Sequence, residues 1–279
     1  MPARSVSFSV VAADPDTLLP AFAALYGVPE ADLNWLTGSL SAAWAALNAE
    51  GQVLGAAGVR PSPAHGHELM GGALRGEQED EVGAALAQAA REAVGQVYAF
   101  ADGGMLSAAA LSAAGLREVA AYRLLAGPVP SQAEVEPPDG VRLLPLSSVP
   151  DLGTRLAALA TYEDRIGHHR VTAQAAEDGA GGYDPDLSLI ALAVGGEAVG
   201  LCRAAPEDGY VRIDAPGVSP DLRPGRLRRA LLLGVCRLAA ERGFEHVSVE
   251  GWGDTPDELA ADLALGLEVQ IENPIYAAP

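Results

Sequence analysis

The sequence predicts an α/β fold built twice, as two tandem halves that each form a mixed, mostly antiparallel sheet flanked by helices. A hairpin pattern recurs at constant spacing, since Gly55 and Gly200 are 145 residues apart and so are Pro61 and Pro206. Around each copy, strand-like and helix-like segments alternate, and a Pro-rich stretch separates the copies. Repetition of one supersecondary plan is typical of a duplicated domain.

Length and composition narrow the possible functions. The chain has 279 residues and a net charge of −19, and it is 49% hydrophobic, which is typical of a folded protein with two domains of about 140 residues. All 18 basic residues are Arg. The absence of Lys excludes a Walker-type P-loop, a pyridoxal Schiff base and a Lys general base. The acidic balance argues against nucleic acid as a partner.

The first half is predicted to run as strand, helices, hairpin, strand, helix, strand, helix and strand. Residues 5–10 alternate apolar and polar, as a strand does and as the apolar core of a signal peptide does not. A long Ala-rich helix is expected to end at Gly95, because glycine suits the left-handed position after a helix. The strand 96–100 follows, and a final strand holds Tyr122.

The second half repeats this order. Its hairpin turns at Gly195-Gly196, and its long helix over 230–242 is expected to end at Gly243. The strand 244–250 follows, and the last strand holds Tyr276. Each half therefore combines a hairpin with a crossover helix, which favours an α/β sheet with helices on both faces.

The repeat places the domains at 1–127 and 139–279, with a Pro-rich linker over 128–138. Cys202 and Cys236 are too few for a disulfide framework and lie in apolar runs. No segment reaches the roughly 18 apolar residues that a membrane span needs. We therefore expect a cytoplasmic protein without membrane contact. For the oligomeric state, we expect a monomer or a homodimer.

The most informative stretch runs from Tyr210 to Arg229, from a strand through a Pro/Gly loop into a helix. Unpaired N–H groups and the helix dipole favour an anion at such a turn. Four arginines surround it: Arg223, Arg226, Arg228 and Arg229. From these residues alone, a phosphate site and a solvated helix start whose arginines pair with surface acids remain equally open.

A resemblance to the GNAT acetyltransferase superfamily bears on this choice. Residues 218–223, Val-Ser-Pro-Asp-Leu-Arg, and then Ala230-Leu231-Leu232 resemble the acetyl-CoA-binding core of that family. Residues 250–255 and Gly266-Leu267 resemble its fifth-strand exit and its Gly-Phe ending, and residues 184–189 resemble its entry to the hairpin. The match covers 139–279. The first half matches only through the duplication, in an arrangement similar to mycothiol synthase.

The resemblance implies two GNAT-like domains and an N-acetyltransferase that moves an acetyl group from acetyl-CoA to a small amine, without a metal. It places the cofactor pyrophosphate on the turn 223–229 and the pantetheine arm along the strand before it. The implied cofactor-binding residues are Gly217, Val218, Arg223, Gly225, Arg226, Leu227, Arg228 and Arg229.

The second half also offers catalytic and acceptor candidates. Asp214 and Glu250 end neighbouring strands and are the candidate bases; the alternative for each is a surface carboxylate without a catalytic role. The family's leaving-group tyrosine falls on Asp262, which would act as an acid only with a strongly raised pKa. Acceptor contacts are expected from the loop after the first helix of this half, at Tyr162, His168 and His169.

Departures from the family pattern keep rival functions open. Its two loop glycines fall on Arg226 and Arg228, where side chains could crowd a pyrophosphate. The equivalent turn in the first half, 78–83, carries three carboxylates, which would repel the pyrophosphate of the cofactor. We therefore do not expect acetyl-CoA to bind in that half. The rivals are a catalytically inactive GNAT-like protein that binds a ligand or acts as a scaffold, and a nucleotide- or phosphate-binding protein.

Overall fold

The structure of the chain is a computed structural model that describes residues 7–102, 105–132 and 135–278. Residues 5 and 6 of the first expected strand, and 133 and 134 of the expected linker, lie outside these ranges. Contacts divide the chain into two units, Met1–Ala121 with Asn273–Pro279, and Tyr122–Glu272. None of the described helices is long and apolar enough to cross a lipid bilayer.

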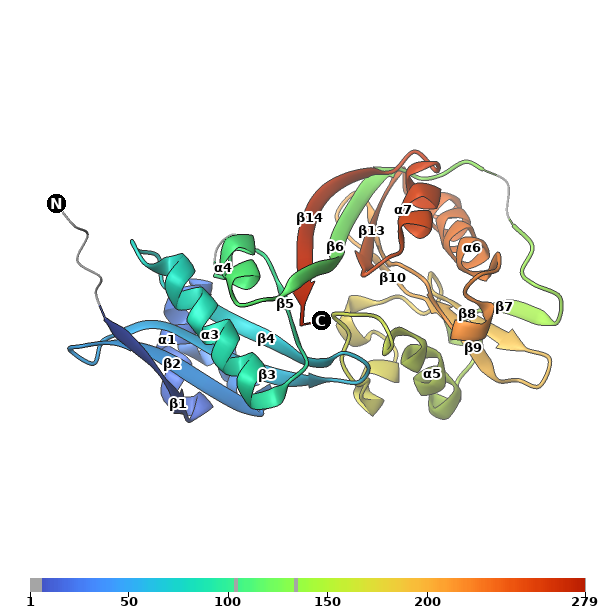
Figure 1. Ribbon diagram of the computed structural model, residues 1–279. Helices are drawn as coiled ribbons and strands as arrows, with labels where there is room; N and C mark the ends of the chain where they lie inside the picture. The colour runs from blue at the N-terminus through green and yellow to red at the C-terminus, as the bar shows by residue number, and fades with distance from the viewer. Residues whose placement is uncertain (1–6, 103–104, 133–134, 279) are drawn as a thin grey trace. The chain divides into compact units, whose positions relative to one another are not determined.

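The first unit is a sheet covered by helices on both faces (Figure 1). Its strands, in spatial order, are β1 (Phe8–Ala13), β2 (Ala42–Asn48), β3 (Val53–Ser62), β4 (Gly66–Ala73), β5 (Val97–Phe100) and the end of β14 (Glu268–Ala277). Its helices are α1 (Leu19–Tyr26), α2 (Asn34–Ser39), α3 (Glu79–Val94) and α4 (Ala108–Ala113). All strand pairs are antiparallel except β4 with β5.

Alternation along β2 explains the two layers. Trp44 and Ala46 pack in the core that α3 covers, whereas Ala43 and Ala45 pack with α1 on the opposite face. Successive side chains of a strand point to opposite faces, so a strand that is apolar at every position is buried on both.

The second unit contains two sheets that diverge from one another. One sheet has the order β12 (Gly217–Val218), β9 (Ala198–Cys202), β8 (Leu189–Ala193) and β7 (Val141–Pro145). The other runs from the start of β14 through β6 (Arg117–Pro128), β13 (His246–Trp252) and β11 (Val211–Asp214) to β10 (Ala204–Pro206). The helices are α5 (Leu152–Leu159), α6 (Leu227–Glu241) and α7 (Pro256–Leu263).

The long helix α6 forms the main core of this unit. Leu231 and Val235 pack with Leu189 and Ala191 of β8, whereas the alternate residue Ile190 packs in the separate core beneath α5. Gly243 follows α6 with a φ of 84°, and Gly95 follows α3 with a φ of 78°. Both glycines therefore have the positive φ expected after each helix, although Gly95, with a ψ of −91°, lies outside the αL region. The α/β fold class predicted from the sequence is confirmed.

The two halves exchange their final strands. The strand β6 comes from the first half of the sequence but pairs with β13 of the second, with Tyr122 opposite Trp252. Conversely, the end of β14 pairs with β5, with Tyr276 opposite Ala99. The two units therefore differ from the domain ranges 1–127 and 139–279, because strand periodicity predicts a strand but does not identify its neighbour.

One strand of the second unit changes sheets halfway. Through Asp214 it runs parallel to β13, with Asp214 opposite Glu250. The Ala215 N–H donates to the Glu250 carbonyl at 3.0 Å, and after Pro216 the chain pairs with β9 instead. A proline has no N–H to continue the ladder. The sheet therefore splits between β12 and β13.

Candidate functional site

Residues from three distant parts of the sequence meet at this split. A cavity of about 10 Å³ is lined by Tyr162 and His168 after α5, by Asp214 of β11, and by Glu250 and Trp252 of β13. The structure thus brings two of the predicted acceptor residues together with both candidate bases. His169 follows His168 in the chain but does not line the described part of this cavity.

Asp214 is held by two side chains. Its Oδ1 accepts a hydrogen bond from the Tyr183 hydroxyl at 2.6 Å, and its Oδ2 accepts from Nε of Arg203 at 2.9 Å. The Arg203 guanidinium also lies 3.9 Å from the centre of the Tyr183 ring. Because both carboxylate oxygens are engaged and the side chain is only 10% exposed, Asp214 is poorly placed to take a proton from a substrate.

Glu250 is the more available of the two carboxylates. Its side chain is 24% exposed, and its nearest described cation is Nη1 of Arg212 at 3.8 Å. That guanidinium also donates to Glu207 and, at 3.0 Å, to the Tyr183 hydroxyl. Burial, and then the charge of Asp214, raise the pKa of Glu250 above its usual range, although Arg212 opposes them. A raised pKa favours proton uptake near neutral pH.

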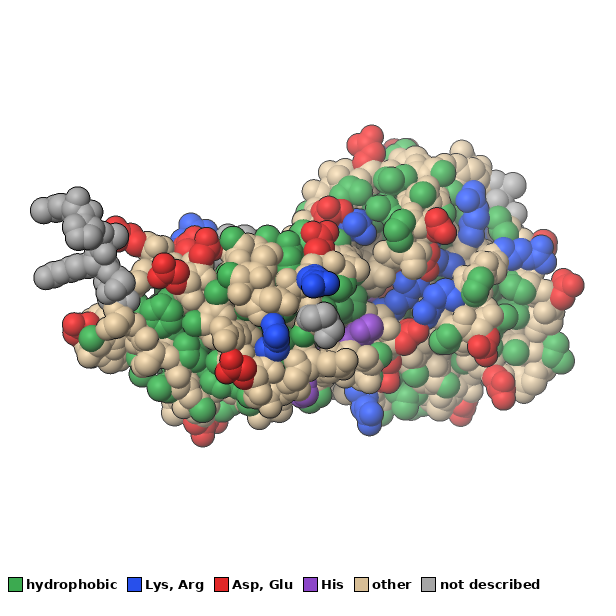
Figure 2. Space-filling model, viewed as in Figure 1, with side chains coloured by type: hydrophobic (Ala, Val, Ile, Leu, Met, Phe, Trp, Pro, Cys, Tyr) green, Lys and Arg blue, Asp and Glu red, His purple; other side chains and the backbone are tan. Residues whose placement is uncertain are grey.

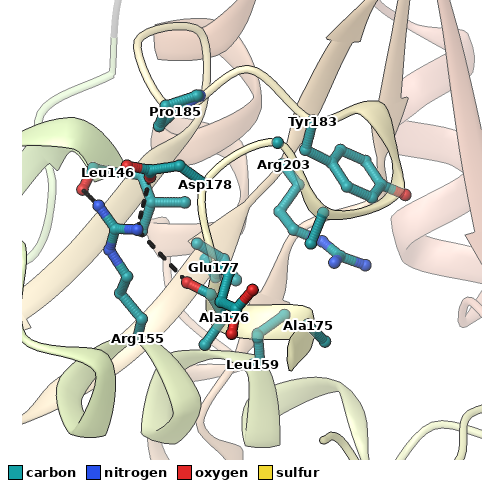
Figure 3. Close-up of a pocket in the computed structure, with 13 residues that line it drawn as sticks. Leu146, Arg155, Leu159, Ala175, Ala176, Glu177, Asp178, Tyr183, Pro185 and Arg203 are labelled. Atoms are coloured by element: carbon teal, nitrogen blue, oxygen red, sulfur yellow. Dashed lines mark hydrogen bonds and ion pairs between the residues drawn. The ribbon is translucent and has the colours of Figure 1, made fainter. Parts of the chain in front are cut away.

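A buried arginine anchors the loop that carries Tyr183 (Figure 3). Arg155 donates to the carbonyls of Val149, Ala176 and Leu146 and pairs with Asp178 at 2.6 Å. The cavity drawn in Figure 3 measures about 20 Å³, which is room for about one water molecule. We conclude that this cavity is part of the support for Tyr183 and not a second ligand site.

Aromatic rings form one wall of the split. His168 stacks on Tyr162 at 5.4 Å and meets Trp252 edge-on at 5.7 Å. Burial lowers the pKa of His168 to about 4, so its imidazole is neutral at pH 7. The Tyr162 hydroxyl donates to the Leu201 carbonyl at 2.9 Å, which ties this wall to β9.

The four arginines line a groove at the start of α6, which begins without a side-chain cap. The groove has a volume of about 500 Å³. It is lined by Pro220, Arg223, Pro224, Gly225, Arg226, Arg228, Arg229, Thr255, Asp257, Glu258 and Ala261. Figure 2 shows Arg side chains gathered on the second unit in the region of α6 and α7. The predicted residue Leu227 is fully buried in the core instead.

Arg228 and Asp262 have roles that differ from the predicted ones. The Arg228 guanidinium makes two hydrogen bonds to the Asp262 carboxylate, at 2.7 and 2.6 Å. Both side chains are buried, at 8% and 2% exposure. A bidentate pair occupies the donors that a phosphate would need and both oxygens that an acid would use. The pair therefore joins α6 to α7, a connection that spacing along the sequence does not reveal.

A second buried pair lies beside the first. Arg165, in the loop after α5, donates to both oxygens of Glu258 in the first turn of α7, at 3.0 and 2.6 Å. The carboxylate of Asp254 lies 3.7 Å from Arg165 and 3.9 Å from Arg228. We call Arg165, Arg228, Asp254, Glu258 and Asp262 the ion cluster. Sequence reasoning missed Arg165, Asp254 and Glu258, although the Thr255–Glu258 spacing of a capping box was a signal for the last.

The ion cluster separates the two cavities. Arg165 and Asp254 line the small cavity at the split, whereas Arg228 and Glu258 line the groove at α6. The strand predicted to hold the pantetheine arm is also engaged. The Val218 carbonyl accepts from Arg223 at 3.1 Å, and the Tyr162 ring packs so closely on Gly217 that a Cβ added there would lie 3.0 Å from it.

In the first unit, the chain itself fills the equivalent split. The Ala73 N–H donates to the Met105 carbonyl at 3.0 Å, and a Cβ added to Gly72 would lie 2.1 Å from that oxygen. The neighbouring groove, of about 470 Å³, is lined by Glu77 and Glu79 with one arginine, Arg75, whereas four arginines line the groove of the second unit. A phosphate-bearing ligand is disfavoured there by charge and by space.

No group of three metal-ligating side chains comes together among the residues placed by the structure.

The chain is similar in structure to several solved proteins at low sequence identity. They include a GCN5-related N-acetyltransferase from Sphaerobacter thermophilus, which is 19% identical with a TM-score of 0.52, over 99% of this chain and 96% of that one. A tandem GNAT protein from the clavulanic acid biosynthesis pathway is 16% identical with a TM-score of 0.52, over 98% of both chains.

A third similar structure is a probable N-acyltransferase of unknown function from Enterococcus faecalis V583, which is 12% identical with a TM-score of 0.60, over 97% of this chain and 72% of that one. No protein-family model and no curated protein sequence matches the chain.

Proposed function

We propose that this chain, which has the fold of the GCN5-related N-acetyltransferases, is an acyltransferase that moves an acetyl group from acetyl-CoA to a small amine. The observation that carries the proposal is the strand split after Asp214, which opens between Glu250 and an Arg-lined groove at the start of α6. The split would put the candidate base Glu250 and the arginines of the groove on one path.

The groove fits the phosphate end of acetyl-CoA. Arg226 is 52% exposed, and its ion pair with Asp139 is loose at 3.6 Å, so its guanidinium is available to an anion. Arg229 lines the same groove, at the second residue after the uncapped helix start. Arginine forks and helix N-termini both bind phosphate oxygens well. Arg226 and Arg229 would hold the diphosphate, with Arg223 beside them.

The passage from the groove to Glu250 fits less well in this arrangement. The small cavity holds about 10 Å³, and Arg165 crosses from one side of the split to Glu258 on the other. A pantetheine arm would have to displace the Arg165–Glu258 pair and the Tyr162 hydroxyl. The proposal therefore requires the loop after α5 to move when acetyl-CoA binds.

The chain's own residues have separable tasks in this reaction. Acetyl-CoA would supply the acetyl group as a thioester. Glu250 would take the proton from the ammonium form of the acceptor and leave a neutral amine as nucleophile. The charge of Asp214, whose carboxylate is fixed by Tyr183 and Arg203, would help to raise the pKa of Glu250. Asp262 is held by Arg228 and is therefore not free to protonate the leaving thiolate.

Two measurements test the proposal. Acetyl-CoA at about 100 times its dissociation constant should stabilise the fold by about 2.7 kcal/mol, which raises the melting temperature by several degrees. Arg226→Glu with Arg229→Glu should abolish that rise, while Arg237→Glu on the exposed side of α6 should leave it. An amine panel should then release free thiol from acetyl-CoA. An unchanged melt with excess acetyl-CoA contradicts the proposal.

A second candidate function is a GNAT-fold protein that binds a phosphate ligand in the groove without acyl transfer. The buried ion cluster favours it, because it fills the passage that a thioester would occupy. One result distinguishes the binding protein from the enzyme. If acetyl-CoA raises the melting temperature but no amine releases thiol, the binding function is supported and the enzyme is not.

A further inference from the structure

The strand exchange places an aromatic side chain of the first half beside the candidate base. Tyr122 of β6 lies directly opposite Trp252 of β13, and Glu250 lies two residues before Trp252 on the same strand. Residues two apart on a strand share a face, and so do directly opposed residues of an antiparallel pair. Tyr122, Trp252 and Glu250 therefore share one face of the sheet.

Direct contacts agree with this register. The rings of Tyr122 and Trp252 are 4.5 Å apart at an angle of 53°, and Trp252 lines the cavity at the split with Glu250. Both rings are only partly buried, so part of each stays accessible. Burial, and then the charge of Glu250, raise the pKa of Tyr122 to about 12, so the phenol stays neutral at pH 7.

The charges around these rings leave a negative excess. Four carboxylates lie at this part of the sheet, Asp214, Glu250, Glu207 and Asp254, against three guanidinium groups, Arg203, Arg212 and Arg165. Two aromatic faces beside one uncompensated carboxylate form an environment that attracts an organic cation.

We propose that Tyr122, together with Trp252 and Glu250, binds the ammonium group of a protonated primary alkylamine, and that the acceptor site of the second half therefore includes a residue of the first. This inference rests on the proposed function for its meaning, since it names the substrate class of that reaction. Tyr122 is an acceptor-binding residue in it: the ring attracts the cation and presents the amine to Glu250.

The test measures binding of n-butylammonium by calorimetry without any acyl donor, with n-butanol as a neutral probe of similar shape. The wild-type chain should bind the ammonium and not the alcohol. Tyr122→Leu keeps apolar volume on the strand but removes the ring, and it should weaken binding about fivefold, within the range of cation–π contacts. Tyr122→Phe keeps the ring and should bind as the wild type does.

Tyr276→Leu is the matched control, because Tyr276 holds the equivalent place on β14 but lies opposite Ala99 in the first unit. It should bind n-butylammonium as the wild type does. If Tyr122→Leu does not fold, Trp252→Leu removes the opposed ring and should give the same loss. Equal affinity in Tyr122→Leu and the wild type overturns the inference, and so does a wild type that does not bind the ammonium or that binds the alcohol as well.

Failure of the proposed function gives a different pattern. A wild type that binds n-butylammonium through Tyr122 but never releases thiol from acetyl-CoA contradicts the transferase and leaves the cation site standing. Thiol release from acetyl-CoA by a wild type that does not bind the ammonium contradicts the cation site alone.

Discussion

Arg165 and Glu258 form a bidentate ion pair across the split of the second unit, with hydrogen bonds of 3.0 and 2.6 Å. The pair lies where a ligand would pass from the arginine groove to Glu250. A buried pair of this kind is costly to break from one side, because the remaining charge loses its partner. It therefore holds the passage closed in the arrangement described.

Removal of both charges of this pair should open the passage. In the double variant Arg165→Gln with Glu258→Gln, the glutamine at 258 can still serve the capping box of α7. We expect acetyl-CoA to bind at least about tenfold more tightly, since a closing free energy of about 1.4 kcal/mol or more is relieved. Calorimetry measures the affinity. The exposed pair variant Arg237→Gln with Glu241→Gln is the control, and equal affinity in all three proteins would show that the ion pair does not gate the site.

Asp262→Asn should act on stability. The substitution leaves the buried Arg228 guanidinium without a full counter-charge, which costs about 3 kcal/mol. Urea unfolding measures this loss, and the exposed Glu241→Gln should change little. If Asp262→Asn instead keeps the stability of the wild type and lowers the rate of thiol release, Asp262 is an acid after all.

Activity should depend on the ionisation of Glu250. The base must be charged to accept a proton, so kcat/KM should fall as the pH decreases through its pKa, which burial places above the usual range of a glutamate. Glu250→Gln should lower kcat by about a hundredfold or more. Asp214→Asn removes the charge that helps raise this pKa, so it should shift the acid limb of the profile to lower pH. An acid limb that persists in Glu250→Gln would assign it to another group.

Acid stability should report on Glu258. Burial alone would raise the pKa of Glu258, but the hydrogen bonds from Arg165 and the Thr255 backbone outweigh it and lower the pKa from 4.5 to about 2. A lowered pKa stabilises the fold above pH 4.5, and this contribution is lost as the pH falls toward 2. Glu258→Gln should therefore flatten the pH dependence of unfolding in that window. A slope equal to that of the wild type would contradict the pairing.

Gly72→Ala should destabilise the first unit. Its Cβ would meet the Met105 carbonyl at 2.1 Å, so the backbone that fills the split must shift. Thermal unfolding should show the loss, while acetyl-CoA binding in the second unit stays unchanged. A stability equal to that of the wild type would show that the segment at Met105 yields easily.

The fold could be predicted from the sequence because its signals are local. The hairpin repeat and the glycines after α3 and α6 are short-range patterns, and the structure has turns and helix ends at those places. The resemblance to the GNAT superfamily is likewise confirmed at the level of the fold. The meeting of Asp214 and Glu250 followed from their places at the ends of neighbouring strands.

What the sequence did not reveal depends on long-range pairing. Arg228 belongs to the same arginine run as Arg226, yet one side chain is buried against Asp262 and the other is half exposed. Only the rotation of α6 against its core decides between them. Likewise, no sequence pattern marks Tyr183 or Arg203. Their role, which is to donate hydrogen bonds to Asp214, depends on the folded chain bringing them to the end of β11.

Because the two halves of the chain exchange their last strands, the sheet of each half is completed by a strand of the other, and the two repeats are not independent modules. A substitution in the closing strand of the first half would alter the proposed acceptor site of the second, because Tyr122 lies opposite Trp252. A gene fragment cut at the connector would encode a second repeat that lacks an interior strand of its sheet. Grafting experiments between relatives should therefore move β6 with the half that it completes.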